Sequence, residues 1–345
     1  MPGRAQVSSG NIRKSMLSNE QLESSLDFLV SLQLSSGMIP WFKGGRADPW
    51  NHSEAVIALA LGGRLANALA GARWLLRMQN RDGSWCHFYL SNGVAEPRRD
   101  SNTCSFPVLL ISILDRLGGT RELLGPYVEM ALRGLDYVIS HQRDDGSMPW
   151  AIDPKGEGYP TSLVAASSSI CDSLTVAGDL CERYGIGDPA RYRAASQRLN
   201  ESLLQGAGPY SDTSRWAMDH YYPLLGGVEG ASSLTEGFLD RFYVPDWGIR
   251  CISGNDWFTA AETAETAMAL HMSGEEALAQ DVYLALHRFR RPGGGYLTGV
   301  VGPHGVTFPH NEQSSYSAAA VIISSYLLSA KVGRSIGGSI LSLFS

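Results

Sequence analysis

The chain has 345 residues, of which 44% are hydrophobic and 18% are charged, an ordinary globular composition that can bury a large core. Its formal net charge of -6 argues against the basic surface that nucleic-acid binding requires, so no nucleic-acid partner is expected. No apolar run approaches the roughly 20 residues that span a bilayer.

The two ends of the chain and its cysteines bear on location. The segment 1–18 is polar and lacks an apolar signal core, which does not indicate export. Five cysteines without paired spacing are typical of reduced thiols in a cytoplasmic protein. The short apolar stretch 336–344 is better explained as a packed or frayed terminus than as a weak contact with a membrane surface. We therefore expect flexible tails at 1–18 and 332–345 around one domain at 19–331.

A short sequence frame recurs where helical stretches end. Residues 79–85, QNRDGSW, place Gln, Gly and Trp at fixed spacing. Residues 33–41, QLSSGMIPW, and residues 142–150, QRDDGSMPW, repeat the Gln and Gly and then end in Pro-Trp. A frame that returns at successive helix ends predicts a duplicated structural unit.

Apolar residues recur at helical spacing along almost the whole chain, and strand-like alternation is scarce. One series of helices, each ending in a Gly-containing turn, is predicted over 20–34, 65–79, 125–142, 190–205, 232–243 and 274–290. A second series, richer in Ala, Ser and Gly, is predicted over 50–62, 103–117, 163–184, 215–229, 257–271 and 313–331. Small side chains allow the close helix approach that an inner ring needs. The alternation predicts an all-α fold, an (α/α)6 toroid whose parallel inner helices open on one mouth.

Polar and aromatic residues gather at the predicted starts of the inner helices. Helix capping explains part of this, because Ser, Thr, Asp and Asn side chains pair with free amides at helix starts. Asp100, Asn102 and Asp256 fit capping as well as they fit function. The predicted lining of a ligand-binding cup is Trp50, His52, Asp100, Asn102, Asp172, Arg215, Trp216, His220, Tyr221, Trp257, Glu265, Glu312 and Tyr316.

Several carboxylates in one partly dry cup push their pKa values apart, so one can serve as an acid while another stays ionised. Asp219 is the first candidate for the acid, with Glu262 and Glu54 as base or electrostatic partners. For each of them a structural ion pair explains the residue equally well. His52, His220 and Glu262 could converge on a metal, but hydrogen-bonded histidines are the preferred explanation, so neither a metal nor a cofactor is expected.

The 79–85 frame is similar to the Gln-Trp repeat of squalene–hopene cyclases and other class II terpene cyclases. The alternating helices also resemble the toroid that those cyclases share with the β subunits of protein prenyltransferases and with prenyltransferase-like proteins. The resemblance implies an enzyme that uses acid/base carboxylates on an isoprenoid or another amphiphilic small molecule. The chain lacks the family's Asp-x-Asp-Asp acid motif, and Asp179-Leu180-Cys181 lies too deep in its helix for the zinc pair of prenyltransferases. No catalytic residue is therefore transferred from the family.

The same toroid resembles glycoside hydrolases and polysaccharide lyases of (α/α)6 fold, in which tryptophans and paired carboxylates line a polar cup. The alternative hypothesis is therefore a glycoside hydrolase or lyase that acts on a saccharide with paired Asp and Glu residues. A non-catalytic binding toroid is the third hypothesis. The isoprenoid hypothesis leads because of the Gln-Trp frame.

Overall fold

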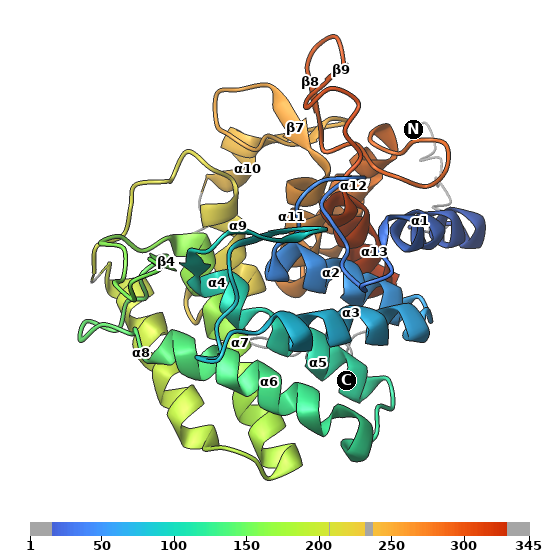
Figure 1. The fold of residues 1–345 in the computed structure, drawn as a ribbon. Helices are drawn as coiled ribbons and strands as arrows, with labels where there is room; N and C mark the ends of the chain where they lie inside the picture. Colours follow the sequence, from blue (N-terminus) through green and yellow to red (C-terminus); the bar gives the residue numbers. More distant parts are fainter. Residues whose placement is uncertain (1–15, 207, 232–236, 330–345) are drawn as a thin grey trace, which may run out of the picture.

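The computed structural model describes residues 16–206, 208–231 and 237–329. Its helices form an inner and an outer ring and alternate between them along the chain (Figure 1). The inner ring consists of α2 (Pro49–Leu61), α4 (Ser101–Ser105) with α5 (Pro107–Arg116), α7 (Val164–Tyr184), α9 (Met218–Leu225), α11 (Ala260–Met272) and α13 (Ser315–Ser329). The outer ring consists of α1 (Asn19–Leu32), α3 (Leu65–Met78), α6 (Arg121–Ile139), α8 (Pro189–Gln205), α10 (Phe238–Phe242) and α12 (Glu276–Leu284), which the 3-10 helix η2 (Ala285–Arg288) extends.

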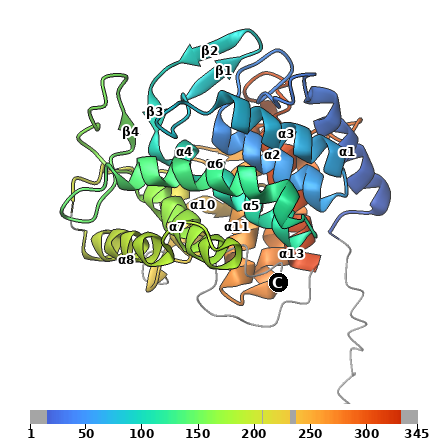
Figure 2. The ribbon, with the colours of Figure 1, turned by 60° about the horizontal axis from the view of Figure 1, so that its bottom comes forward.

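The inner ring is closed. Each inner helix packs on the next one in the chain, and α13 packs back on α2. The outer helices α3, α6 and α8 pack on the outside of α2, α5 and α7 (Figure 2). Inner helices are buried on almost every side, which explains why their sequences are apolar or small all round. The prediction of an (α/α)6 toroid is confirmed.

Two predicted helices differ from the observed ones for local reasons. The helix predicted over 103–117 is broken at Phe106, because Pro107 has no amide hydrogen with which to continue the first segment. The helix predicted over 215–229 is reduced to α9, because the chain before it pairs with residues 251–252 instead of entering the helix. Residues 232–236 of the outer helix predicted over 232–243 lie outside the described residues.

The recurring Gln and Gly join successive outer helices. In each copy the glutamine amide donates to the carbonyl of the glycine in its own turn and to a carbonyl on the next outer helix. These bonds run from Gln33 to Gly37 and Asn67, from Gln79 to Gly83 and Met130, and from Gln142 to Gly146 and Ala195, over 2.7 to 3.2 Å. We call this arrangement the glutamine clamp.

The glycine of the clamp is required by both its conformation and its neighbour. Gly83 has φ of +91°, and a Cβ at this position would overlap the backbone carbonyl of Arg133 on α6. The Trp85 indole that follows is fully buried and donates to the Leu75 carbonyl at 2.9 Å. The frame therefore has a structural role between outer helices.

The two faces of the toroid have different connections. Every strand of the described residues lies in a connection from an outer to an inner helix: β1 (Phe88–Leu90), β2 (Gly93–Glu96), β3 (Arg99–Asp100), β4 (Ala151–Ile152), β5 (Tyr243–Val244), β6 (Gly248–Ile249), β7 (Trp257–Thr259), β8 (Gly299–Val301) and β9 (Val306–Thr307). They pair antiparallel as β1–β2, β3–β4, β5–β6 and β7–β8–β9. Connections on the opposite face are as short as 62–64 and 273–275. We call the face with the long connections, at the N-terminal ends of the inner helices, the mouth.

The chain ends are described in part. Ser18 caps α1 through a capping box with Gln21, and Met16 and Leu17 before it are buried. The predicted tail at 332–345, with its apolar stretch, lies outside the described residues, and the boundaries of the single domain stay predictions. None of the described helices has the length and apolar character needed to cross a membrane.

Candidate functional site

The start of α2 places at the mouth a carboxylate that the sequence analysis missed, Asp48. Its Oδ1 accepts from the Asn51 amide at 2.9 Å, which caps the helix. Its Oδ2 accepts from the Trp41 indole at 2.5 Å and from the Asn51 side-chain amide at 2.8 Å. Asp48 is 2% exposed, and burial raises its pKa. The Asp-Pro pair formed with Pro49 is a common helix-start signal and could have pointed to it.

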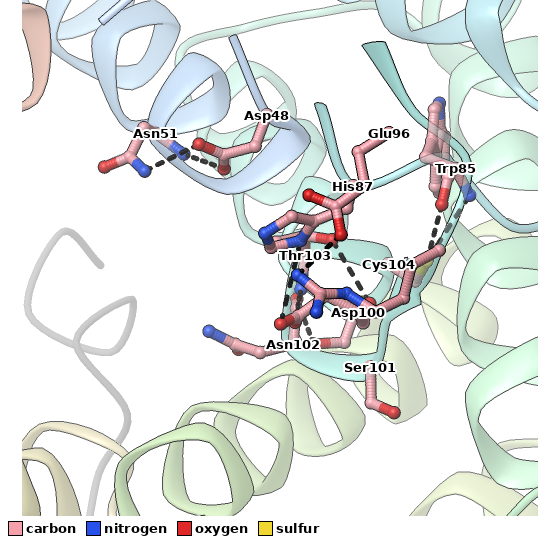
Figure 3. Close-up of polar contacts among 12 residues, drawn as sticks. Asp48, Asn51, Trp85, His87, Glu96, Asp100, Ser101, Asn102, Thr103 and Cys104 are labelled. Atoms are coloured by element: carbon pink, nitrogen blue, oxygen red, sulfur yellow. Dashed lines mark hydrogen bonds and ion pairs between the residues drawn. The ribbon is translucent and has the colours of Figure 1, made fainter. Parts of the chain in front are cut away.

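The neighbouring start of α4 carries a second carboxylate, Asp100, which is partly buried (Figure 3). It caps the helix, one of the two roles that the sequence left open, by accepting from the Thr103 amide at 3.0 Å. Burial raises the pKa of Asp100 to about 6, and the charge of Asp48 adds to the effect. His87 points toward Asp100 with Nδ1 3.9 Å from Oδ2, and burial lowers the pKa of this histidine to about 4. His87 is therefore neutral near pH 7, so the contact is no ion pair at that pH.

Asn102, in the first turn of α4, is also buried, with 1% of its surface exposed. Within the described part of the chain, neither its amide oxygen nor its amide nitrogen has a hydrogen-bond partner. Its side chain points away from Asp100 (Figure 3). An unpaired buried amide costs about 1–3 kcal/mol, a cost that the hydroxyl groups of a polar ligand can remove.

Below the mouth, three of the predicted carboxylates, Glu54, Asp172 and Glu265, face one cavity of about 60 Å³. All six inner helices contribute to its wall. Its polar lining is Glu54, Ser169, Asp172, Tyr222 and Glu265, and the remainder is mainly aliphatic. Three predicted carboxylates thus line one cavity, but in the lower and largely apolar part of the toroid.

Two of the cavity carboxylates, Glu54 and Glu265, have different hydrogen-bond partners. Glu54 accepts from the Trp50 indole at 2.9 Å. Glu265 accepts from the Tyr222 hydroxyl at 2.9 Å and from the Tyr221 hydroxyl. Burial, followed by the charge of Glu265, raises the pKa of Glu54 well above its usual range. Burial also raises the pKa of Glu265, although its two phenol donors oppose the shift.

Glu262, in the first turn of α11, is half-buried and faces the mouth side of that helix. One carboxylate oxygen accepts from the Cys251 thiol at 3.2 Å, and the other accepts from the Thr259 hydroxyl. Burial raises the pKa of Cys251, and the charge of Glu262 adds to this. The thiol therefore stays protonated as a donor to Glu262.

Tyr316 lies in the first turn of α13, at the mouth. Its ring packs edge-on against Trp41 at 5.6 Å, the indole that binds Asp48. Burial raises the pKa of Tyr316 to about 12, and the charges of Glu262 and Glu312 contribute to the shift. Since α13 packs on both α2 and α11, this tyrosine connects the surroundings of Asp48 and Glu262.

The predicted acid, Asp219, lies at the start of α9. Its Oδ1 accepts from the Ala165 amide at 3.3 Å and its Oδ2 from the Thr213 hydroxyl. This contact caps α7, which has no side-chain cap from its own N-cap residue. Burial raises the pKa of Asp219. The adjacent His220 bonds through Nε2 to the Ser214 carbonyl at 2.8 Å.

The other predicted aromatic residues lie along the rim. The guanidinium of Arg215, which is exposed, lies 5.6 Å from the ring centre of Trp216. Trp257 donates to the Phe308 carbonyl at 3.1 Å and packs edge-on against its ring at 5.5 Å. Phe308 itself is 54% exposed, which leaves an aromatic surface available at this edge of the mouth.

His52 does not face the mouth. Its Nδ1 accepts from the Ile39 amide and its Nε2 bonds to the Gly71 carbonyl, both at 3.1 Å. The ring packs against Trp74 of the outer helix α3 at 4.4 Å, and burial lowers its pKa to about 4. His52 is thus a neutral link between inner and outer rings, and we leave it out of the proposed site.

Two arginine–aromatic contacts at the mouth were not predicted. The guanidinium of Arg46 lies 4.3 Å from the ring centre of Trp41 and 3.9 Å from that of Phe88. The guanidinium of Arg98 lies 4.6 Å from the ring centre of Trp150. Trp41 and Trp150 are the last residues of two copies of the repeated frame, for which the sequence predicted only a structural role. Among the described residues, no three His, Cys, Asp or Glu side chains are grouped to hold a metal.

Comparison with known proteins identifies a close relative and a shared fold. No family model matches the chain. The MMP endo-(1,4)-3-O-methyl-alpha-D-mannosidase of Mycolicibacterium hassiacum is 32% identical over 318 residues, which cover 91% of this chain and 88% of that enzyme. A D-mannose isomerase structure has a TM-score of 0.65 at 12% identity and covers 90% of this chain and 98% of its own. A glycosidase in complex with glucose has a TM-score of 0.67 at 13% identity, with coverage of 90% and 99%. Both structures share the toroid fold.

The expected membership of the terpene cyclase and prenyltransferase-like toroids is wrong. The relative detected by sequence is an endo-mannosidase, and the structural neighbours include a mannose isomerase and glycosidases. The physical reason for the error is the glutamine clamp, which joins outer helices and carries no chemistry. The findings support the alternative, a toroid of the glycoside hydrolase kind.

Proposed function

The chain belongs to the family of the MMP endo-(1,4)-3-O-methyl-alpha-D-mannosidase, and we propose that it hydrolyses internal α-(1,4) bonds of mannose chains that carry 3-O-methyl groups. The observation that carries this proposal is the 32% identity over 91% of the chain. A mouth that combines buried carboxylates with aromatic rings supports it, because a sugar offers apolar faces for stacking and hydroxyl groups for hydrogen bonding.

The catalytic pair in this proposal is Asp48 as general acid and Glu262 as general base. Burial raises the pKa of Asp48, which favours the protonated form that an acid needs. Glu262 lies on α11, and α11 and α2 both pack on α13. Tyr316 at the start of α13 contacts Trp41, the partner of Asp48, and the charge of Glu262 contributes to its raised pKa, so a sugar bound above this tyrosine would reach both carboxyls.

In the proposed reaction, Asp48 gives its proton to the glycosidic oxygen as the bond between this oxygen and the anomeric carbon breaks. Glu262 takes a proton from a water molecule, whose oxygen forms the new bond to the anomeric carbon. The products are two shorter saccharides, and the two carboxyl groups have exchanged protonation states. One proton must return from Glu262 to Asp48 through solvent before the next turnover.

We favour inversion at the anomeric carbon. Inverting enzymes separate their carboxyl groups by about 6.5–9.5 Å to admit the water, whereas retaining enzymes need about 5–5.5 Å. Because one inner helix stands between α2 and α11, the wider spacing is the better match. Proton NMR of the first product released will show β anomers if the enzyme inverts and α anomers if it retains.

Asp219 is the second candidate for the acid, since burial raises its pKa too and it lies at an inner-helix start. Eight of the predicted lining residues would bind the saccharide. We propose this role for Trp50, Asp100, Asn102, Arg215, Trp216, Trp257, Glu312 and Tyr316.

The test of function uses the full chain with two matched substrates, an α-(1,4) oligosaccharide of 3-O-methylmannose and its unmethylated counterpart. Mass spectrometry of early time points should find fragments of intermediate length from the methylated chain, as internal cleavage requires. Release of single sugars from one end would contradict endo action. A lack of cleavage and of calorimetrically detectable binding with both substrates would contradict the proposed substrate class.

A further inference from the structure

The cavity carboxylates Glu54 and Glu265 lie on the same two helices as the proposed catalytic pair, but deeper in the toroid. Glu54 follows Asp48 along α2, and Glu265 follows Glu262 by one turn of α11. Both line the cavity of about 60 Å³ below the mouth. The start of α2 and the helix α11 therefore carry two pairs of carboxyl groups at different depths: Asp48 with Glu262 at the mouth, and Glu54 with Glu265 below it. The deeper pair has no role in the proposed reaction.

The lower pair supports a group of three aromatic rings that we call the aromatic floor: Trp50, Phe106 and Tyr222. The Trp50 ring packs edge-on against Tyr222 at 5.7 Å and tilted against Phe106 at 5.8 Å. Glu54 binds the Trp50 indole and Glu265 binds the Tyr222 hydroxyl, each at 2.9 Å. Two rings of the floor are therefore fixed by one carboxyl group each.

The two carboxyls cannot both be ionised at low cost, because they are like charges in a largely apolar cavity. The titratable groups around them are Asp48, Asp172, Tyr221, Tyr222, Cys251 and Glu262, while α5 and α13 present apolar side chains. Lysine, arginine and histidine are absent from the described lining of the cavity. Protonation of one of the two carboxyls is the remaining way to reduce the repulsion.

Hydrogen bonding decides which carboxyl keeps this proton. Glu265 accepts from two phenols, Tyr221 and Tyr222, and these donors favour its ionised form. Glu54 accepts from one indole, that of Trp50, and its protonated form leaves that bond intact. The proton therefore belongs on Glu54 and the negative charge on Glu265.

We infer that Glu54 and Glu265 are positioning residues, one protonated and one ionised, that hold Trp50 and Tyr222 as the floor on which the sugar ring stands between Asp48 and Glu262. The inference rests on the proposed function for its sugar, but the arrangement of the floor itself does not depend on any substrate. It assigns no proton transfer in the reaction to Glu54, in contrast to the role expected from the sequence.

The kinetic test compares Glu54→Gln with Glu265→Gln. At pH 7, Glu54→Gln imitates a protonated carboxyl and still accepts from Trp50, so kcat and KM should stay within about twofold of the wild type. Glu265→Gln offers one acceptor oxygen to two phenols, and KM should rise about tenfold or more while kcat changes less. In the wild type KM should also rise as the pH rises through the raised pKa of Glu54, and in Glu54→Gln this rise should be absent.

The inference would be overturned if Glu54→Gln lost kcat about a hundredfold at unchanged KM, since that result identifies Glu54 as the catalytic acid. A second variant distinguishes the two roles further. Glu54→Ala should bind the saccharide more weakly at every pH, because alanine cannot accept the hydrogen bond of the Trp50 indole.

A second readout needs no substrate, so its failure is separable from failure of the proposed function. The chain has 8 Trp, and subtracting the near-ultraviolet circular dichroism of Trp50→Phe from that of the wild type isolates Trp50. This difference signal should change in the wild type as the pH is raised from neutral to the alkaline limit of the folded protein, and it should stay constant in a Glu54→Gln background. A signal that is constant with pH in the wild type would refute the proton on Glu54, whatever the saccharide results are.

Discussion

The outer ring and the mouth of the inner ring are built in contrasting ways. Outer helices are joined by the same clamp three times, with a glutamine that binds two carbonyls and a glycine that touches the next helix. At the mouth the carboxylates differ in their further partners: Asp48 binds an indole, Asp219 caps a neighbouring helix and Glu262 accepts from a thiol.

This contrast indicates which contacts carry information about function. A repeated contact solves a problem that occurs at every repeat, which is the joining of one helix to the next. A polar contact that occurs once has no such general cause. Capping alone could have been achieved by the same contact at every inner helix, so a contact that differs from its counterparts points to another role. The frame at 79–85 is conspicuous in the sequence because it is repeated, and for the same reason it carries no information about the substrate.

The largest effect that we expect at the mouth comes from Asp48→Asn and Glu262→Gln. Each should lower kcat about a hundredfold or more, because each removes the proton donor or acceptor of the proposed reaction. Asparagine caps a helix as well as aspartate does, so the free energy of unfolding of Asp48→Asn should fall by about 1 kcal/mol or less. Initial rates and urea unfolding measure the two quantities.

The matched control is Asp256→Asn, at an exposed carboxylate that pairs with Arg250 near the rim. Its kcat should stay within about twofold of the wild type, since exposed pairs contribute little energy. If Asp219→Asn lost more activity than Asp48→Asn, the second candidate for the acid would replace the first.

In the outer ring the largest effect should come from Gly83→Ala. The new Cβ would overlap the Arg133 carbonyl at a φ of +91°, and we expect the free energy of unfolding to fall by about 3 kcal/mol or more. Gly118 has a similar φ of +93° with open space around it, so Gly118→Ala should cost about 1–2 kcal/mol, from backbone strain alone. Both variants should keep the kcat of the wild type per folded molecule.

Most of the fold follows from the sequence because its causes are local. Apolar spacing and glycine turns place nearly all of the helices within a few residues, and the alternation of the two helix types gives the toroid. The start of α9 could not be predicted, since it depends on pairing with residues 251–252 after a long connection.

The site follows from the sequence in part. Placing the carboxylates at inner-helix starts was enough to identify Glu54, Glu262 and Glu265 as residues facing the interior. Asp48 was missed because a capping residue carries no mark of its other partner, an indole from an earlier turn. His52 was misplaced although it is two positions from Glu54, a spacing that puts the two on diverging faces of a helix.

The carboxyl pair below the mouth should make stability depend on pH. Burial raises the pKa of Glu54 well above its usual range, whereas a glutamate has a pKa of about 4.3 in the unfolded chain. Between about pH 4.3 and the raised pKa of Glu54 the folded protein binds more protons than the unfolded one, so its free energy of unfolding falls as pH rises. Urea unfolding at pH 5 and pH 8 should give a smaller fall for Glu54→Gln than for the wild type. The exposed Glu129 on α6 provides the control, and Glu129→Gln should reproduce the wild-type fall.

The smallest effect is expected from removing an arginine–aromatic contact, and such a contact occurs on each of the two faces of the toroid. Arg46 stacks on Trp41 at the mouth, and Arg121 lies 5.9 Å from the ring centre of Tyr184 on the opposite face. A partly exposed cation–π contact is worth about 0.5–1 kcal/mol, so each arginine-to-alanine change should cost a similar, small amount of stability. Because Trp41 binds Asp48, Arg46→Ala should in addition raise KM about two- to fivefold, an amount that corresponds to the same energy. Arg121→Ala should leave KM unchanged, and an equal rise in both variants would mean that stability, and not the position of Trp41, controls binding at the mouth.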